Sequence, residues 1–117
     1  MKETVDLLNE WNSSQEKFLT EWPEQMAAFA GLSSAVKAPG SLDVKYKYLI
    51  ALALGITAHC DWCIAAHTRN ALEAGATREE ILEASWMAVL MGGGPALMYM
   101  QVVQKALEDL SPQGEAV

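Results

Sequence analysis

The chain has 117 residues, of which 51% are hydrophobic and 20% charged; this composition excludes an intrinsically disordered protein and fits one domain. Eight basic residues against 15 acidic ones give a net charge of -7, which argues against a protein built to bind nucleic acid or an anionic membrane. Two cysteines are too few for a secreted disulfide scaffold.

The N-terminal residues, MKETVDLLNEWNSSQEKF, lack the apolar core of a signal peptide, so we expect a cytoplasmic protein. The apolar stretch Leu49–Ala58 is shorter than the ~20 residues that cross a bilayer. The stretch Ala84–Met100 is interrupted by Gly92–Pro95, so we expect both to be buried helices and no membrane segment. The apolar content is high for this length, and we expect part of that surface to pack against other subunits.

We predict six helices and no strand, hence an all-α bundle that spans 1–117 as a single domain, with a core at about 40–105. The N-terminal helices fall within 4–36: one covers about 4–19, and Pro23 suits the first position of the next. A third helix covers about 41–58. Its second half is apolar on every side, which predicts a central, fully covered helix.

The fourth helix covers about 61–74 and ends before Gly75, as expected for a glycine just past a helix. Thr77–Glu80 reads as a capping box that opens a fifth helix, ending near Met91. The glycines at 92–94 interrupt the helical pattern, and Pro95 begins a sixth helix that ends near Leu110. We interpret the glycines as a tight helix crossing, since a phosphate loop would need a lysine and a preceding strand. Residues 111–117 are expected to form a loose tail.

Both cysteines and both histidines lie in one short segment, HCDWCIAAH at 59–67. Cys60 and Cys63 are three residues apart, and His67 follows Cys63 by four, so a helix places all three side chains on one side. A helix N-terminus, a nearby imidazole and a neighbouring thiol each favour a thiolate, whereas Asp61 opposes it. Such a thiolate attacks hydroperoxides or disulfides, and the sulfenic acid formed on a hydroperoxide condenses with the second thiol to a disulfide.

Cys63 is our candidate for the attacking thiol, because the local base His67 lies one turn beyond it. Cys60, at the entrance of the helix, would then resolve the sulfenic acid. The reverse order, as in thioredoxin-type motifs where the N-terminal cysteine attacks, stays open. We interpret His59 by itself as a loop or capping histidine.

Two alternatives carry no redox chemistry. The cysteines could be inert buried apolar residues. Alternatively, Cys60, Cys63, His67 and His59 could bind zinc, but structural zinc sites usually join two distant ligand pairs, and these four are adjacent in sequence. We therefore expect no metal.

Three stretches together resemble the carboxymuconolactone decarboxylase family, and in particular its alkyl hydroperoxidase D-like branch. They are LDVKYK at 42–47, CDWC followed by AAH at 60–67, and EAGATREEILE at 73–83. The resemblance covers about 40–105, and MGGGP at 91–95 resembles small hexameric members of the branch.

The resemblance implies an all-helical fold and homo-oligomers, often trimers or hexamers. It implies peroxidase activity on a hydroperoxide substrate, with no cofactor beyond a redox-active Cys60–Cys63 disulfide, which a dithiol reductant protein or a small thiol recharges. It makes Cys63 peroxidatic, Cys60 resolving and His67 part of a proton relay. The true decarboxylases of the family lack the cysteine pair, so the lactone reaction is less expected.

The sequence departs from the family at one relay position. A glutamate usually stands twelve residues before the first cysteine, where this chain has Tyr48, and a phenol is a poor base at neutral pH. Either the relay ends at His67 or another side chain acts as its proton acceptor. The candidates are Tyr48, Glu83 and His59, followed by Glu21 or Glu24. A non-catalytic oligomer that binds a partner or senses redox state through the same cysteines is the alternative function.

Overall fold

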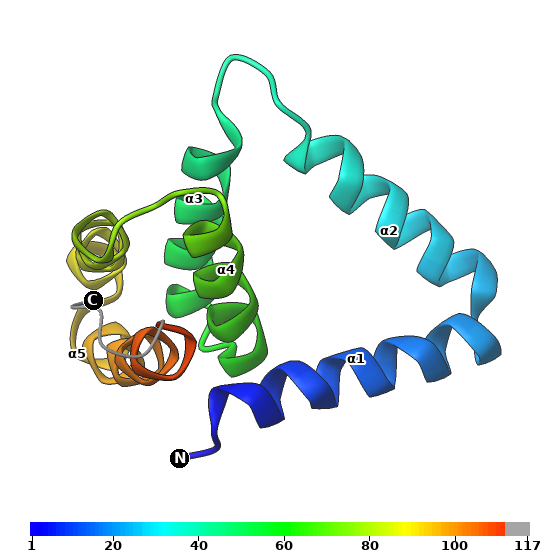
Figure 1. The fold of residues 1–117 in the computed structure, drawn as a ribbon, viewed down its shortest axis with the longest axis horizontal. Helices are drawn as coiled ribbons and strands as arrows, with labels where there is room; N and C mark the ends of the chain where they lie inside the picture. Colours follow the sequence, from blue (N-terminus) through cyan, green and yellow to red (C-terminus); the bar gives the residue numbers. More distant parts are fainter. Residues whose placement is uncertain (112–117) are drawn as a thin grey trace.

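The computed structural model describes residues 1–111, and this part of the chain is helical without strands (Figure 1). The helices are α1 (Thr4–Glu21), α2 (Pro23–Lys37), α3 (Val44–Thr57), α4 (Asp61–Glu73) and α5 (Arg78–Leu110). The predicted all-α class is confirmed. Apart from Ser111, the expected C-terminal tail lies outside the described residues.

Residues 1–111 form five helices where six were predicted, because α5 includes both of the last two predicted helices as its halves. The break falls among the three glycines: Gly93 has φ 67° and ψ -149°, outside helical values, and the helix resumes at once with Pro95 inside it. A β-carbon on the preceding Gly92 would come within 2.9 Å of Ala96 Cβ and 3.6 Å of Thr57 Cγ2 of α3. The predicted break at the glycines is thus confirmed: the helical backbone is interrupted where it approaches α3, and α5 consists of two helical halves on either side of this kink.

The ends of the helices follow the local sequence signals. Pro23 occupies the first turn of α2, and Gly75, just past α4, has φ 93°, a conformation that glycine adopts without steric cost. The capping box of α5 is reciprocal: Glu80 N–H donates to Thr77 Oγ1 at 3.1 Å, and Thr77 N–H donates to Glu80 Oε1 at 2.9 Å. These three predictions are confirmed.

The hydrophobic core lies between α3, α4 and α5, which pack against one another (Figure 1). Its fully buried side chains include Leu52 and Ile56 of α3, Ile64 of α4, and Ile81 and Val103 of α5. A fully buried aliphatic side chain contributes roughly 1.5–3 kcal/mol relative to its exposed state. The core therefore fixes α4 firmly against α3 and α5.

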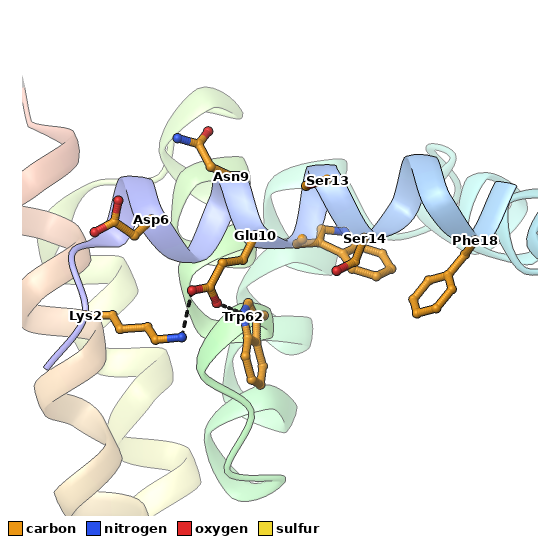
Figure 2. Close-up of a pocket in the computed structure, with 9 residues that line it drawn as sticks. Lys2, Asp6, Asn9, Glu10, Ser13, Ser14, Phe18 and Trp62 are labelled. Atoms are coloured by element: carbon orange, nitrogen blue, oxygen red, sulfur yellow. Dashed lines mark hydrogen bonds and ion pairs between the residues drawn. The ribbon is translucent and has the colours of Figure 1, made fainter. Parts of the chain in front are cut away.

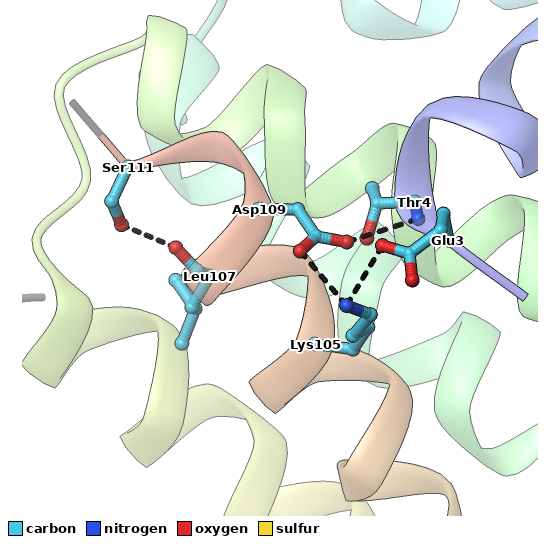
Figure 3. A network of polar contacts seen from close by, with 6 residues as sticks. All are labelled: Glu3, Thr4, Lys105, Leu107, Asp109 and Ser111. Atoms are coloured by element: carbon cyan, nitrogen blue, oxygen red, sulfur yellow. Dashed lines mark hydrogen bonds and ion pairs between the residues drawn. The ribbon is translucent and has the colours of Figure 1, made fainter. Parts of the chain in front are cut away.

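The first two helices form an N-terminal arm (residues 4–37): α1 extends away from this core, and α2 runs back from its far end toward the start of α3 (Figure 1). The arm is anchored at its first residues: Thr4 N–H donates to Asp109 Oδ2 at 3.1 Å, and Lys105 Nζ bridges Glu3 at 2.8 Å and Asp109 at 3.0 Å (Figure 3). The hydrogen bonds with Glu3 and then Asp109 raise the pKa of Lys105 above its usual range. In contrast, α2 buries no residue.

The prediction that α3 is fully covered is wrong for a single chain. Ile50 and Leu54 are 49% and 63% exposed, because α4 and α5 cover only the opposite side of α3. Large apolar side chains are also exposed on the helices that flank this face. They are Phe29, Leu32 and Val36 of α2, and Trp86, Met87, Leu90, Met91, Leu97 and Met98 of α5.

One helix in the described part of the chain, α5, is long and apolar enough to cross a membrane by length and composition. Its most apolar window has a mean hydropathy of 1.3, and 22% of that window is buried within the chain. Gly93 interrupts this helix, and core helices of soluble proteins pass the same test.

Candidate active site

The cysteine motif sits at the junction of α3 and α4. After α3 ends at Thr57, the chain reverses through His59, whose φ of 56° is left-handed, and Cys60 N–H donates back to Gly55 O at 3.1 Å. Cys60 is then the N-cap of α4, Cys63 lies in its first turn, and His67 lies one turn further. The predicted helical placement of the motif is correct.

The two cysteines form a disulfide, with their Cα atoms 5.2 Å apart. Cys63 N–H donates to Cys60 Sγ at 3.2 Å, so a sulfur takes the place of the usual capping oxygen. Backbone N–H groups and the helix dipole at this end would stabilise a thiolate on Cys60 after reduction. The structure therefore adds a physical argument for attack by Cys60, the cysteine for which the sequence favours the resolving role.

A glycine lets the motif approach α3 closely. A β-carbon on Gly55 would lie 3.2 Å from Cys63 Cβ, closer than most contacts between β-carbons. Because Gly55 is itself buried, the two helices meet at this point without room for a larger side chain. The position of Cys63 is thus set by backbone contact with α3.

His67 is half-buried, and burial is the main reason that its pKa is lowered; the charges of Lys37 and Arg69 lower it further. An imidazole with a lowered pKa is neutral at neutral pH and can accept a proton. Its Nδ1 is buried and makes no hydrogen bond to any residue in 1–111. No hydrogen bond joins His67 to Cys63 in this oxidised state.

Tyr48, which replaces the expected glutamate, lies beside His67. The two ring centroids are 6.4 Å apart, and the rings are tilted by 32°. The sequence position therefore does bring the side chain to the imidazole. Arg69, two residues after His67, donates from Nε and from Nη2 to Asn70 Oδ1, each at 3.4 Å.

The carboxylates that could replace the missing glutamate do not reach His67. Glu83 is exposed on α5, while Glu21 and Glu24 are exposed on the arm. None of the three makes a side-chain hydrogen bond or ion pair within residues 1–111, so their relay role stays a prediction without structural support. His59 stacks on Tyr99, with centroids 4.6 Å apart and an interplanar angle of 3°. This contact fits a loop histidine.

Two residues that the sequence analysis did not single out also approach the motif. Glu10 of α1 accepts the indole N–H of Trp62 at 3.0 Å and pairs with Lys2 at 2.7 Å (Figure 2). Lys37, the last residue of α2, places Nζ 5.8 Å from the ring centroid of Tyr48. Both lie far from the motif in sequence and carry no local signal, so only the folded arm could reveal them.

Trp62 also faces an open cavity of about 960 Å³ between α1 and α4 (Figure 2). Trp11 and Phe18 contribute apolar surface to it, and Lys2, Asp6 and Glu10 contribute charges of both signs. The cavity therefore borders the residue that separates the two cysteines.

As for a metal centre, the described residues hold no group of three or more histidine, cysteine or carboxylate side chains able to bind an ion.

A family model described as "Carboxymuconolactone decarboxylase family" matches residues 23–104. Among curated proteins, an uncharacterized protein from the cox locus of Paracoccus denitrificans is 40% identical over 83 residues, which are 71% of this chain and 75% of that protein. An uncharacterized protein of Cupriavidus necator is 44% identical over 77 residues, or 66% of this chain and 68% of that one.

Solved structures agree with the sequence matches. A carboxymuconolactone decarboxylase family protein from Legionella pneumophila superposes with a TM-score of 0.90 at 40% identity, covering 93% of this chain and 97% of that one. A Thermotoga maritima protein of the same family, described as "possibly involved in antioxidative response", gives a TM-score of 0.80 at 32% identity, with 88% of each chain covered.

Proposed function

This chain belongs to the carboxymuconolactone decarboxylase family, and on that premise we propose that it is a thiol-dependent peroxidase of the alkyl hydroperoxidase D-like type. The observation that carries the proposal is the Cys60–Cys63 disulfide at the N-terminus of α4, one turn before the half-buried imidazole of His67. A disulfide at such a position can cycle between dithiol and oxidised states. The antioxidative description of the Thermotoga relative is consistent with this chemistry.

The reaction begins with the reduced protein. The Cys63 thiolate attacks the terminal oxygen of a hydroperoxide, the O–O bond breaks, and the alkoxide takes a proton to leave as an alcohol. The Cys60 thiolate then attacks the sulfur of the Cys63 sulfenic acid, which forms the disulfide and releases hydroxide that becomes water on protonation. A dithiol reductant protein or a small thiol returns both electrons and two protons, restores the two thiols and is itself oxidised to a disulfide.

His67 supplies the proton transfers in this scheme. Because its pKa is lowered, the neutral imidazole takes the Cys63 proton and can then donate that proton to the leaving alkoxide. With no carboxylate bonded to His67 within residues 1–111, the relay is shortened to the imidazole, with the Tyr48 phenol beside it.

The N-cap contact at Cys60 favours the alternative in which Cys60 attacks the peroxide and Cys63 resolves. Variants that keep a single cysteine show which of the two attacks. We expect reduced Cys60→Ser to react with one equivalent of peroxide and hold a sulfenic acid on Cys63. Cys63→Ser should react at no more than the rate of a free thiol. If Cys63→Ser consumed peroxide at the wild-type rate, Cys63 would not be the attacking thiol.

We further propose that the chain forms a homo-oligomer, a trimer or hexamer, in the cytoplasm. The support is the apolar surface of α2, α3 and α5 that one chain leaves uncovered. Burying such surface between identical subunits gives roughly 25 cal/mol per Å² of apolar area. An assembly would cover α3 on both sides, as its all-round apolar sequence requires.

A second function is favoured by the Trp62–Glu10 hydrogen bond, which links the cysteine motif to the arm. In this alternative the protein turns over peroxide slowly or not at all, and oxidation changes its assembly or binding. Measuring the size of the oxidised and the reduced protein beside a peroxide assay separates the two functions. A decarboxylase activity is the least supported, because that reaction would not use the cysteine pair.

A further inference from the structure

Lys37, whose charge acts on His67, pairs with no carboxylate in the part of the chain that the structure describes. Lys2, Lys45 and Lys105 each pair with a carboxylate, at 2.7 to 2.9 Å. Lys37 is half-buried, yet no carboxylate of residues 1–111 comes within ion-pair distance of it. Acidic residues outnumber basic ones by 15 to 8, so a half-buried lysine at the candidate site that pairs with no carboxylate of residues 1–111 is unexpected.

The backbone around Lys37 is fastened to α3. Lys47 Nζ of α3 donates to the backbone carbonyls of Val36 and Ala38, at 2.9 and 2.5 Å, and so fixes the end of α2 on either side of Lys37. The Lys37 ammonium then lies 5.8 Å from the Tyr48 ring centroid, and that ring lies 6.4 Å from the His67 ring. Three helices thus bring together an ammonium, a phenol and an imidazole.

These three groups suit an anion. An ammonium offers three donors, a phenol offers one, and an imidazole can offer one, whereas an ionised carboxylate only accepts. The buried Nδ1 of His67 has no hydrogen-bond partner among residues 1–111, and leaving a buried polar atom unpaired is unfavourable. Because the charge of Lys37 already acts on His67, an anion placed here would interact with both groups.

We propose that Lys37, Tyr48 and His67 form a binding site for the carboxylate of a substrate, next to the Cys60–Cys63 disulfide. The inference rests on the proposed redox function, because the carboxylate is borne either by the hydroperoxide or by the thiol that reduces the disulfide. His67 lies one helical turn from Cys63, so roughly 5–6 Å separates their β-carbons. A molecule whose carboxylate sits on Lys37 can therefore present a reactive group to the sulfur.

Binding is tested first on the oxidised protein, so that the result does not depend on turnover. The probe is hexanoate, with neutral hexanamide as its control, and NMR titration follows the His67 ring and the backbone amides. We expect hexanoate to bind, hexanamide not to bind, and the pKa of His67 to rise when the anion is present. Lys37→Met should weaken hexanoate binding at least fivefold, and Lys17→Met, which removes an exposed lysine of the arm, should not.

Equal binding of hexanoate and hexanamide, or unchanged binding to Lys37→Met, overturns the anion site whether or not the protein is a peroxidase.

A second measurement identifies which substrate bears the carboxylate. Rates are compared for a fatty-acid hydroperoxide and its methyl ester, and for a carboxylate-bearing dithiol and its amide. The pair whose preference for the acid disappears in Lys37→Met identifies the substrate that carries the carboxylate. If Lys37→Met changes neither preference, the site does not serve a substrate and the proposal fails, even if binding and turnover both remain.

Discussion

The indole N–H of Trp62 donates a 3.0 Å hydrogen bond to Glu10, and this bond ties the cysteine motif to the N-terminal arm (Figure 2). Glu10 also pairs with Lys2 at 2.7 Å; the hydrogen bond from Lys2, and then that from Trp62, lower the pKa of its carboxyl group. Within α1, the residues buried against the rest of the chain are Thr4 and Leu7, both near its start. The side chain between the two cysteines is therefore part of what holds α1 in place.

Removing this carboxylate should loosen the arm. We expect Glu10→Ala to increase hydrogen exchange across Thr4–Glu21, because both the indole and the Lys2 ammonium lose their acceptor. Glu16→Ala, on the same helix, removes a side chain without either partner and should leave exchange unchanged. Hydrogen exchange followed by mass spectrometry provides the measurement. Identical exchange in the two variants would mean that the bond does not hold the arm.

The lowered pKa of His67 predicts how stability depends on pH. Its pKa in the folded chain lies below the ordinary value of 6.5, mainly because of burial and secondarily because of the charges of Lys37 and Arg69. Between 6.5 and the folded value, the unfolded chain binds a proton that the folded chain does not, so the free energy of unfolding decreases as pH falls. Denaturant titrations from pH 7.5 to 5 measure this slope.

The variant His67→Gln is the control for that slope. It removes the titrating group, so the free energy of unfolding should fall less on acidification than in the wild type. An equally steep fall in the variant would assign the pH dependence to other groups.

The contact between α3 and the motif predicts a costly substitution at a small residue. In Gly55→Ala the new methyl group would come 3.2 Å from Cys63 Cβ, and both helices are fixed by the core. We expect a loss of about 1–3 kcal/mol in the free energy of unfolding. Gly31→Ala in α2 is the matched control, because nothing lies within 4 Å of its β-carbon and alanine favours a helix by up to ~1 kcal/mol. Equal effects at the two sites would contradict the close packing.

The exposed apolar face predicts subunit contacts. Leu90 of α5 is 71% exposed, and Leu90→Glu should dissociate the homo-oligomer or reduce its size, because a buried unpaired charge is costly. Gln104→Glu adds the same charge at an exposed polar position of the same helix and should leave the assembly intact. Light scattering during size-exclusion chromatography gives the mass. A monomeric wild-type protein would refute the proposed oligomer directly.

The sequence predicts those parts of the fold that depend on local signals. Pro23, Gly75 and the Thr77–Glu80 capping box act within one helical turn, so their effects could be predicted without knowing the fold. The break at Gly93 was also predictable, because three glycines followed by a proline are a local signal. The direction in which the second half of α5 continues depends instead on how the two halves pack against α3.

What could not be predicted depends on contacts between distant segments. The spacing of Cys60, Cys63 and His67 predicted their common helix, but not that Lys37 and Glu10 would approach it from the arm. Likewise, an apolar pattern around α3 indicates burial but does not say whether the same chain or another one covers it. An apolar pattern indicates that a surface is covered, but it does not indicate which chain covers it.

The most direct test of the central claim is the pH dependence of thiol alkylation in the reduced protein. Iodoacetamide rates for Cys60→Ser and Cys63→Ser measure the ionisation of each remaining thiol. The helix N-terminus and His67 predict that at least one of the two titrates well below the ordinary cysteine pKa of ~8.5. If both thiols titrate at the ordinary value, the motif holds no activated sulfur and the proposed peroxidase mechanism is contradicted.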